Sequence, residues 1–174
     1  MSTPVLPPPR GATYRLGFVC LGNICRSPMA DVVMSSLVAE AGLAHVVEVG
    51  SSGTGGWHVG QPMDERAAAT LTEAGYDATR HRAAQHDATW GDLDLVLAMD
   101  ASNLADVGGE TERVRLFRSF DPAVSRSSVE PVETTPPDVP DPYYGGDEGF
   151  ADVLAMVERT CTALLDGLVA LDLG

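Results

Sequence analysis

Cys20 and Arg26 have the residue types and the spacing expected of an anion-binding catalytic loop. The residues between them are Leu21, Gly22, Asn23, Ile24 and Cys25. A loop of this kind between a strand and a helix turns successive backbone N–H groups toward one point, where the helix dipole adds positive potential. The same potential stabilises a thiolate at the base of the loop. The planar fork of an arginine can grip two oxygens of a tetrahedral oxyanion.

A carboxylic acid far downstream completes a set of groups suited to phosphoryl transfer. Asp141 stands between two prolines and is followed by Tyr143 and Tyr144. In this interpretation Cys20 attacks phosphorus, Arg26 and the loop amides stabilise the equatorial oxygens, and Asp141 protonates the leaving oxygen. Water then releases phosphate, with the same carboxylate acting as the base. This scheme requires no metal and no other cofactor.

The alternative is that Cys20 is an ordinary buried thiol whose spacing from Arg26 arose by chance. The spacing alone is weak evidence. Three further features accompany it: a strand-like segment before the loop, a helix start at Ser27-Pro28 after it, and the downstream acid. Ser27 can also donate a hydrogen bond to the thiolate and make it a better leaving group in the second step. We therefore favour the catalytic role.

The composition of the whole chain excludes several function classes. A net charge of −14 argues against binding to nucleic acid or to an anionic membrane, because both require basic patches. All 11 basic residues are arginine, which excludes lysine-dependent nucleotide loops, Schiff bases and lysine bases. The 3 cysteines do not form a secreted disulfide framework, because their number is odd. We therefore expect a cytoplasmic protein.

The elements that position these residues follow from hydrophobic periodicity. The pattern predicts strands at 14–20, 46–49, 93–99 and 114–117, and helices at 28–41, 64–74 and 150–171. Asp100 is predicted to cap a further short helix. Strands that alternate with helices predict an α/β fold of three layers, a central four-stranded parallel sheet flanked by helices. The phosphate-binding loop then follows the first strand, at the edge where such folds bind ligands.

The boundaries of the domain are predicted from composition. Residues 13–174 are expected to form one domain. The proline-rich residues 1–12 contain no apolar run of signal-peptide length and are expected to be a disordered tail. Residues 125–137 lack periodicity and are expected to be a mobile insert. No segment approaches the length of a membrane span.

Aromatic and histidine side chains add candidate site residues. Trp57 lies in a glycine-rich loop and is expected to wall a pocket; the alternative is that its ring folds back onto the core. His81 and His86 are close in the sequence, but no further histidine, cysteine or carboxylate cluster completes a metal-ligand set around them. We therefore expect no metal site.

These motifs resemble the low-molecular-weight protein tyrosine phosphatases, in the form found in actinobacteria. The resemblance extends from about Leu16 to the last helix and rests on Cys-Leu-Gly-Asn-Ile-Cys-Arg-Ser-Pro-Met-Ala, Gly-Thr-Gly-Gly-Trp-His-Val-Gly, His-Arg-Ala-Ala-Gln, Met-Asp and Asp-Pro-Tyr-Tyr-Gly. It implies hydrolysis of phosphotyrosine in proteins, with Cys20 as nucleophile, Arg26 as the phosphate-binding arginine and Asp141 as general acid. The segment 125–137 has no counterpart that we can place in the family.

The resemblance implies roles for the surrounding residues. Asn23 would shape the loop through a bond to His81. Trp57, Tyr143 and Tyr144 would wall a deep slot for an aromatic phosphoester.

The resemblance also implies two forms of regulation and an oligomeric state. Cys25 would form a reversible disulfide with Cys20 and protect it from further oxidation. A tyrosine kinase would phosphorylate Tyr143 or Tyr144; the alternative, which we favour, is that both rings are only pocket walls. The protein is expected to be a monomer or a weak dimer.

Two other functions fit the same scaffold less well. Arsenate reductases need a resolving thiol in the segment equivalent to 80–92, which contains no cysteine here. A catalytically dead phosphotyrosine-binding module would be expected to lose Cys20, Arg26 or Asp141, and all three are present.

Overall fold

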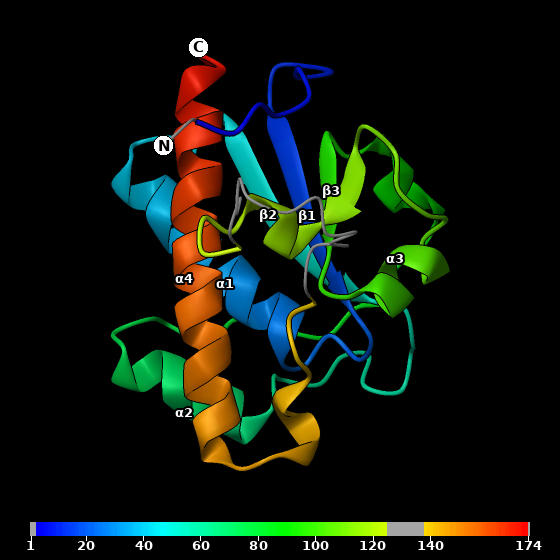
Figure 1. The fold of residues 1–174 in the computed structure, drawn as a ribbon, viewed down its shortest axis with the longest axis vertical. Helices are drawn as coiled ribbons and strands as arrows, with labels where there is room; N and C mark the ends of the chain where they lie inside the picture. Colours follow the sequence, from blue (N-terminus) through cyan, green and yellow to red (C-terminus); the bar gives the residue numbers. More distant parts are fainter. Residues whose placement is uncertain (1–2, 125–137, 174) are drawn as a thin grey trace, which may run out of the picture.

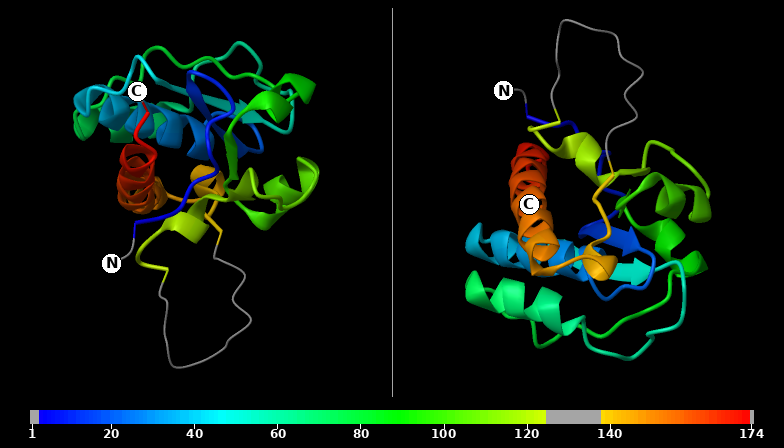
Figure 2. Two further views of the ribbon diagram at one scale, coloured as in Figure 1. Left: turned by 90° about the horizontal axis from the view of Figure 1, so that it is seen from above. Right: turned by 60° about the horizontal axis from the view of Figure 1, so that its bottom comes forward.

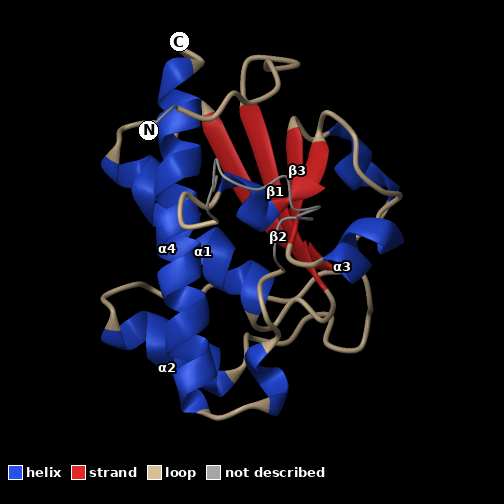
Figure 3. Cartoon of the chain, in the orientation of Figure 1, coloured by secondary structure: helices blue, strands red, loops and turns tan. Residues whose placement is uncertain are grey.

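The computed structural model describes residues 3–124 and 138–173, in which a four-stranded parallel sheet lies among helices (Figures 1 and 3). The strand order is β2-β1-β3-β4, with bounds β1 Tyr14–Cys20, β2 Val47–Gly53, β3 Leu95–Ala98 and β4 Val114–Leu116. Cys20 pairs with Gly53 of β2, and Val19 pairs with Ala98 of β3. The carboxyl ends of these strands therefore meet at one edge, and the predicted α/β class is confirmed.

The helices confirm the predicted order with small shifts of their ends. Their bounds are α1 Arg26–Glu40, α2 Glu65–Glu73, α3 Ala101–Asp106 and α4 Asp147–Ala170. Short 3₁₀ helices cover Ala88–Asp92, Phe117–Phe120 and Pro142–Tyr144. The last helix starts three residues earlier than predicted. The acidic side chains of Asp147 and Glu148 lie in its first turn, where they stabilise the helix by interacting with the positive end of its dipole.

Strand β2 is longer than the predicted 46–49. It continues through Ser51 and Ser52 to Gly53 because the whole of β1 pairs with it. Glycine and serine have low strand propensity, so the tertiary pairing overrides the local preference. The extension matters for the site, since it brings the polar end of β2 beside the loop that follows Cys20.

The main core lies between the sheet and the helices α1 and α4. Phe18 of β1 packs edge-to-face against Phe117, with ring centroids 5.6 Å apart. Cys161 is completely buried on α4, and burial raises its pKa well above the usual value. A smaller cluster covers the other face of the sheet and includes Val19, Leu93, Val96, Trp90 and Val107.

Residues 3–12 lie against the domain, which corrects the prediction of a disordered tail. They cross the end of the sheet opposite to the β1–α1 loop (Figure 1). Leu6 is only 4% exposed and sits over Gly167, where an added Cβ would lie 2.9 Å from the Leu6 side chain. The Tyr14 hydroxyl donates to the Pro7 carbonyl oxygen at 3.0 Å. Residues 3–12 are thus held by the Leu6 side chain and by hydrogen bonds between their backbone and the side chains of Tyr14, Asp94 and Arg113, although their proline-rich composition predicted disorder.

Residues 125–137, predicted to be a mobile insert, lie outside the described residues. Within the two described stretches, no helix has the length and hydrophobicity needed to cross a membrane.

Candidate active site

The loop between β1 and α1 forms the floor of a pocket of about 280 Å³ at the carboxyl end of the sheet. Asn23 in this loop has a φ of +57°, in the left-handed region that asparagine tolerates better than most residues. The first turn of α1 contains no acidic residue that would offset its positive potential. The pocket is lined by Cys20, Leu21, Gly22, Ile24, Cys25, Arg26, Trp57, His58, Asp141, Tyr143 and Tyr144.

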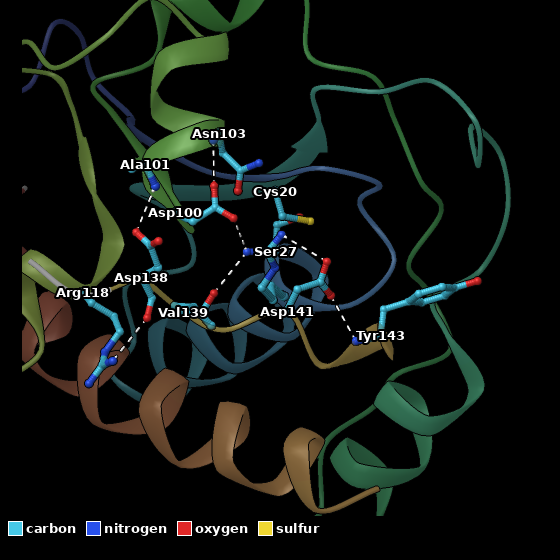
Figure 4. A network of polar contacts seen from close by, with 11 residues as sticks. Cys20, Ser27, Asp100, Ala101, Asn103, Arg118, Asp138, Val139, Asp141 and Tyr143 are labelled. Atoms are coloured by element: carbon cyan, nitrogen blue, oxygen red, sulfur yellow. Dashed lines mark hydrogen bonds and ion pairs between the residues drawn. The ribbon is translucent and has the colours of Figure 1, made fainter. Parts of the chain in front are cut away.

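The sulfur of Cys20 is hydrogen-bonded at the bottom of this pocket. Cys20 Sγ lies 2.9 Å from Ser27 Oγ, and both residues are buried (Figure 4). Asn23 Nδ2 donates to the same Ser27 oxygen at 2.8 Å. Because this oxygen already accepts a hydrogen bond, the Ser27 hydroxyl can donate its own proton to the sulfur, and the Ser52 carbonyl at 3.4 Å is the more distant alternative acceptor. The arrangement gives the sulfur a hydrogen-bond donor at the floor of the pocket.

Asn23 and His81 are in contact, although through the backbone of Asn23. His81 Nε2 lies 2.7 Å from the Asn23 carbonyl oxygen. Burial, together with the nearby Arg82, lowers the pKa of His81, so the neutral ring donates its Nε2 proton to this carbonyl. The Asn23 side chain instead bonds Ser27, the Ser51 hydroxyl at 3.0 Å and the backbone N–H of residue 84 at 2.9 Å. The loop is therefore fixed from both β2 and the segment near His81.

The guanidinium of Arg26 is buried and held in one orientation. Its Nη1 donates to Asp100 Oδ2 at 2.6 Å and to the Val139 carbonyl oxygen at 3.1 Å. Burial disfavours the charge of Arg26, but the neighbouring Cys20, Asp100 and Asp141 outweigh it and raise the pKa of the arginine. These contacts leave the Nη2 side of the guanidinium turned toward the pocket.

Asp100 lies in the site, although the sequence predicted it only as a helix cap and as part of the Met-Asp motif, with no role beside Arg26. It does cap α3, since its Oδ1 accepts the Asn103 N–H at 2.7 Å, but its other oxygen holds Arg26. The signal that could have identified it is its place directly after a central strand. Carboxyl ends of parallel strands carry the functional residues of such folds.

Asp141 stands at the side of the pocket next to the arginine. Its Oδ2 lies 3.7 Å from Arg26 Nη2, and its Oδ1 accepts the Tyr143 N–H at 3.0 Å. The segment that carries it passes beside the β1–α1 loop although the two are far apart in the sequence (Figure 2). A third of the Asp141 side chain is exposed, so a bound ester can reach it.

Three aromatic rings stand at the mouth of the pocket. The exposed fractions are 70% for Trp57, 41% for Tyr143 and 86% for Tyr144. The alternative that Trp57 folds back onto the core is therefore wrong. Arg66, which the sequence analysis missed, supports this wall: its guanidinium stacks 5.6 Å from the Tyr143 ring centre and donates to the Tyr143 carbonyl at 3.0 Å.

Cys25 lines the same pocket as Cys20. Both are free thiols, and Cys25 is only 5% exposed. Burial, with a contribution from Asp64, raises the pKa of Cys25 to about 12. The second thiol of the loop therefore stays protonated at neutral pH.

Comparisons with known proteins agree with this geometry. The family model described as low molecular weight phosphotyrosine protein phosphatase matches residues 15–172. A low molecular weight protein-tyrosine-phosphatase of Streptomyces coelicolor is 48% identical over 160 residues, which cover 88% of this chain and 92% of that protein. The low molecular weight protein-tyrosine phosphatase A of Mycobacterium tuberculosis is 45% identical over 152 residues, 86% of this chain and 88% of that protein.

A solved structure of a similar protein has the same fold. The protein tyrosine phosphatase of Entamoeba histolytica superposes with a TM-score of 0.78 at 30% identity, over 91% of this chain and 98% of the other. The resemblance noted in the sequence is confirmed: this chain belongs to the low molecular weight phosphotyrosine protein phosphatase family.

Proposed function

We propose that this protein hydrolyses phosphotyrosine in protein substrates through a phosphocysteine on Cys20. The observation that carries the proposal is that Cys20, Arg26 and Asp141 line one pocket, with the sulfur hydrogen-bonded to Ser27 at its floor. The names of the similar proteins support the same substrate class.

In the first step, the Cys20 thiolate attacks phosphorus while the bond to the phenolic oxygen breaks. The loop N–H groups and Arg26 Nη2 stabilise the equatorial oxygens in the transition state. Protonated Asp141 gives its proton to the leaving phenolate, so tyrosine departs neutral. The products of this step are a phosphocysteine and an Asp141 carboxylate.

In the second step, Asp141 takes a proton from water, which attacks phosphorus and displaces the Cys20 thiolate. The Ser27 hydroxyl stabilises the departing sulfur at the 2.9 Å contact. Both steps use positive charge that the loop and Arg26 supply, so we propose that the reaction is independent of metal ions.

The aromatic walls suit an aryl ester. The flat faces of Trp57 and Tyr143 can stack on a substrate ring, which places its phosphate near the loop. A short alkyl phosphate that binds to the loop makes no stacking contact with these rings. We therefore propose that the site prefers phosphotyrosine to phosphoserine.

As a secondary proposal, a tyrosine kinase phosphorylates the exposed Tyr144 hydroxyl. Charge added there would lie near Asp141 in the same pocket. Incubation with a tyrosine kinase and mass spectrometry tests this, and an unmodified Tyr143-Tyr144 peptide would remove the idea.

The main test is release of p-nitrophenol from p-nitrophenyl phosphate, with EDTA and a thiol reductant present. Turnover should vanish in Cys20→Ser, and a slower reaction should survive in Asp141→Asn. After rapid acid quenching, labelled phosphate should be found on Cys20. A reduced, folded wild type without turnover would contradict the proposal, and a requirement for added metal would contradict the mechanism.

A further inference from the structure

The segment that carries Asp141 is attached to the start of α3 (Figure 4). Arg26 is attached to the cap of the same helix. Asp100 caps this helix and holds Arg26 Nη1 at 2.6 Å. Asp138 Oδ1 accepts the Ala101 N–H of the same helix at 3.0 Å. The phosphate-gripping arginine and the acid segment therefore share one point of attachment.

The backbone between this attachment and the acid has little freedom. The N–H of Val139 donates to the Met99 carbonyl at 2.8 Å, and the Val139 carbonyl accepts from Arg26 at 3.1 Å. Val139 is completely buried. Pro140 follows with its φ fixed by the ring, and Asp141 is the next residue. A change in the position of this segment is thus passed directly to the Asp141 carboxyl group.

Arg118 holds the same segment from the opposite side. Its Nη1 donates to the Asp138 carbonyl at 3.3 Å, and its Nε donates to Asp121 Oδ2 at 3.1 Å. Asp121 is completely enclosed and also accepts two hydrogen bonds from Arg159 of α4, at 2.8 and 2.9 Å. Although burial alone raises it, these hydrogen bonds hold the pKa of Asp121 below the usual value. Arg118 and Asp121 therefore form a charged and fixed ion pair, which connects α4 to Asp138.

We propose that Asp138 is a positioning residue for Asp141. Its hydrogen bond to the start of α3 fixes the general acid relative to Arg26, and Arg118 secures the same residue through its carbonyl oxygen. The inference rests on the proposed function, since it presumes that Asp141 protonates the leaving group. Asp138 itself is not among the residues that line the pocket.

A displaced acid should slow only those esters whose leaving group needs a proton. Phenol, with a pKa of about 10 like tyrosine, needs one, whereas the much more acidic 2,4-dinitrophenol leaves as the anion. The measured quantity is kcat/KM, which covers the steps up to release of the phenol. In Asp138→Ala, kcat/KM for phenyl phosphate should fall about tenfold, a part of the roughly 10²–10⁴-fold that general acid catalysis supplies. The value for 2,4-dinitrophenyl phosphate should stay near that of the wild type.

Two further variants separate this role from a general structural one. Asp138→Asn keeps an oxygen that can accept the Ala101 N–H, so it should retain most of the activity toward phenyl phosphate. Asp106→Ala removes one negative charge from the other, exposed end of α3. It should leave kcat/KM unchanged for both esters. Should Asp138→Ala fail to fold, Arg118→Met removes the second support, while Asp121 keeps its bonds from Arg159.

Asp141→Asn serves as the reference that separates the two proposals. Asp141→Asn should lower kcat/KM for phenyl phosphate much more than for 2,4-dinitrophenyl phosphate. If it does so, but Asp138→Ala lowers kcat/KM equally for both esters or for neither, the positioning role is overturned and the proposed function stands. If Asp141→Asn itself shows no selectivity, the assignment of the general acid fails, and the positioning role fails with it.

Discussion

Arg26 Nη1 lies 2.6 Å from Asp100 Oδ2, in a pair whose side chains are 4% and 20% exposed. The pair is enclosed enough that the carboxylate fixes the direction of the guanidinium. The second nitrogen, Nη2, then points toward Asp141 and the pocket. The arginine is thus oriented before any phosphate binds, which reduces the entropy that substrate binding has to overcome.

The first prediction concerns removal of this partner. Asp100→Ala leaves a buried guanidinium without its carboxylate and α3 without its cap, which should lower the free energy of unfolding by about 2–5 kcal/mol. The loss of orientation should also lower kcat/KM for aryl phosphates about 10²-fold. Urea unfolding and steady-state kinetics measure the two effects.

Asp100→Asn is the matched control for this prediction. Its one amide oxygen can still cap α3 at Asn103, but its Nδ2 then faces Arg26 Nη1 as a second donor. The share of stability that the cap supplies should therefore return, while kcat/KM should stay as low as in Asp100→Ala. Equal kinetics in Asp100→Ala and the wild type would show that Arg26 needs no such partner.

The order of strands and helices could be predicted from the sequence because hydrophobic periodicity is local. Cys20, Arg26 and Asp141 could be selected from the sequence because their types are rare in combination, and all three line one pocket, while their catalytic roles stay a prediction. Asp100 and Arg66 could not be assigned to the site, because their roles depend on Arg26 and on the Tyr143 backbone, which are distant in the sequence. The packing of Leu6 was missed for the same reason, since its partner Gly167 stands at the far end of the chain.

The second prediction concerns the hydroxyl that contacts the nucleophile. Ser27→Ala removes the 2.9 Å hydrogen bond to the Cys20 sulfur. A hydrogen bond to a charged group contributes about 1.5–3 kcal/mol, so release of the thiolate from phosphocysteine should slow about 10–10²-fold. The acid-assisted first step should change less. Stopped-flow measurement should therefore show a burst of p-nitrophenol equal to the enzyme concentration, and a single slow phase without a burst would contradict this role.

The third prediction concerns oxidation of the two loop cysteines. Because the pKa of Cys25 is raised to about 12, peroxide should react first with Cys20, and Cys25 should then close a disulfide on the sulfenic acid. Wild-type protein inactivated by peroxide should regain its activity with dithiothreitol. Cys25→Ala should not, because its Cys20 is free to proceed to the sulfinic acid. Mass spectrometry distinguishes the two products, and full recovery in Cys25→Ala would exclude the protective role.

The fourth prediction concerns the packing of residues 3–12. Leu6→Ala leaves a cavity over Gly167 and should lower the free energy of unfolding by about 2–3 kcal/mol, as Leu to Ala changes do at buried sites. The kinetics should not change, because this contact lies at the opposite end of the sheet from Cys20. Val5→Ala, at a neighbouring side chain that is 86% exposed, is the control and should be close to neutral. Equal stabilities of the two variants would show that the segment does not pack in solution.

The fifth prediction concerns the pH dependence of stability that arises from His81. Burial lowers its pKa in the folded protein, so below about pH 6.5 the unfolded chain binds a proton that the folded chain does not. Stability should therefore fall as pH decreases from 6.5 to 5, by at most about 1.4 kcal/mol per pH unit for this group. His86 acts in the same direction, and Asp31, whose pKa is raised to about 6, acts in the opposite one. The contribution of His81 is therefore measured as the difference between the wild type and His81→Gln in urea unfolding at each pH. An identical pH dependence in both proteins would mean that His81 titrates in the folded protein as it does in the unfolded chain.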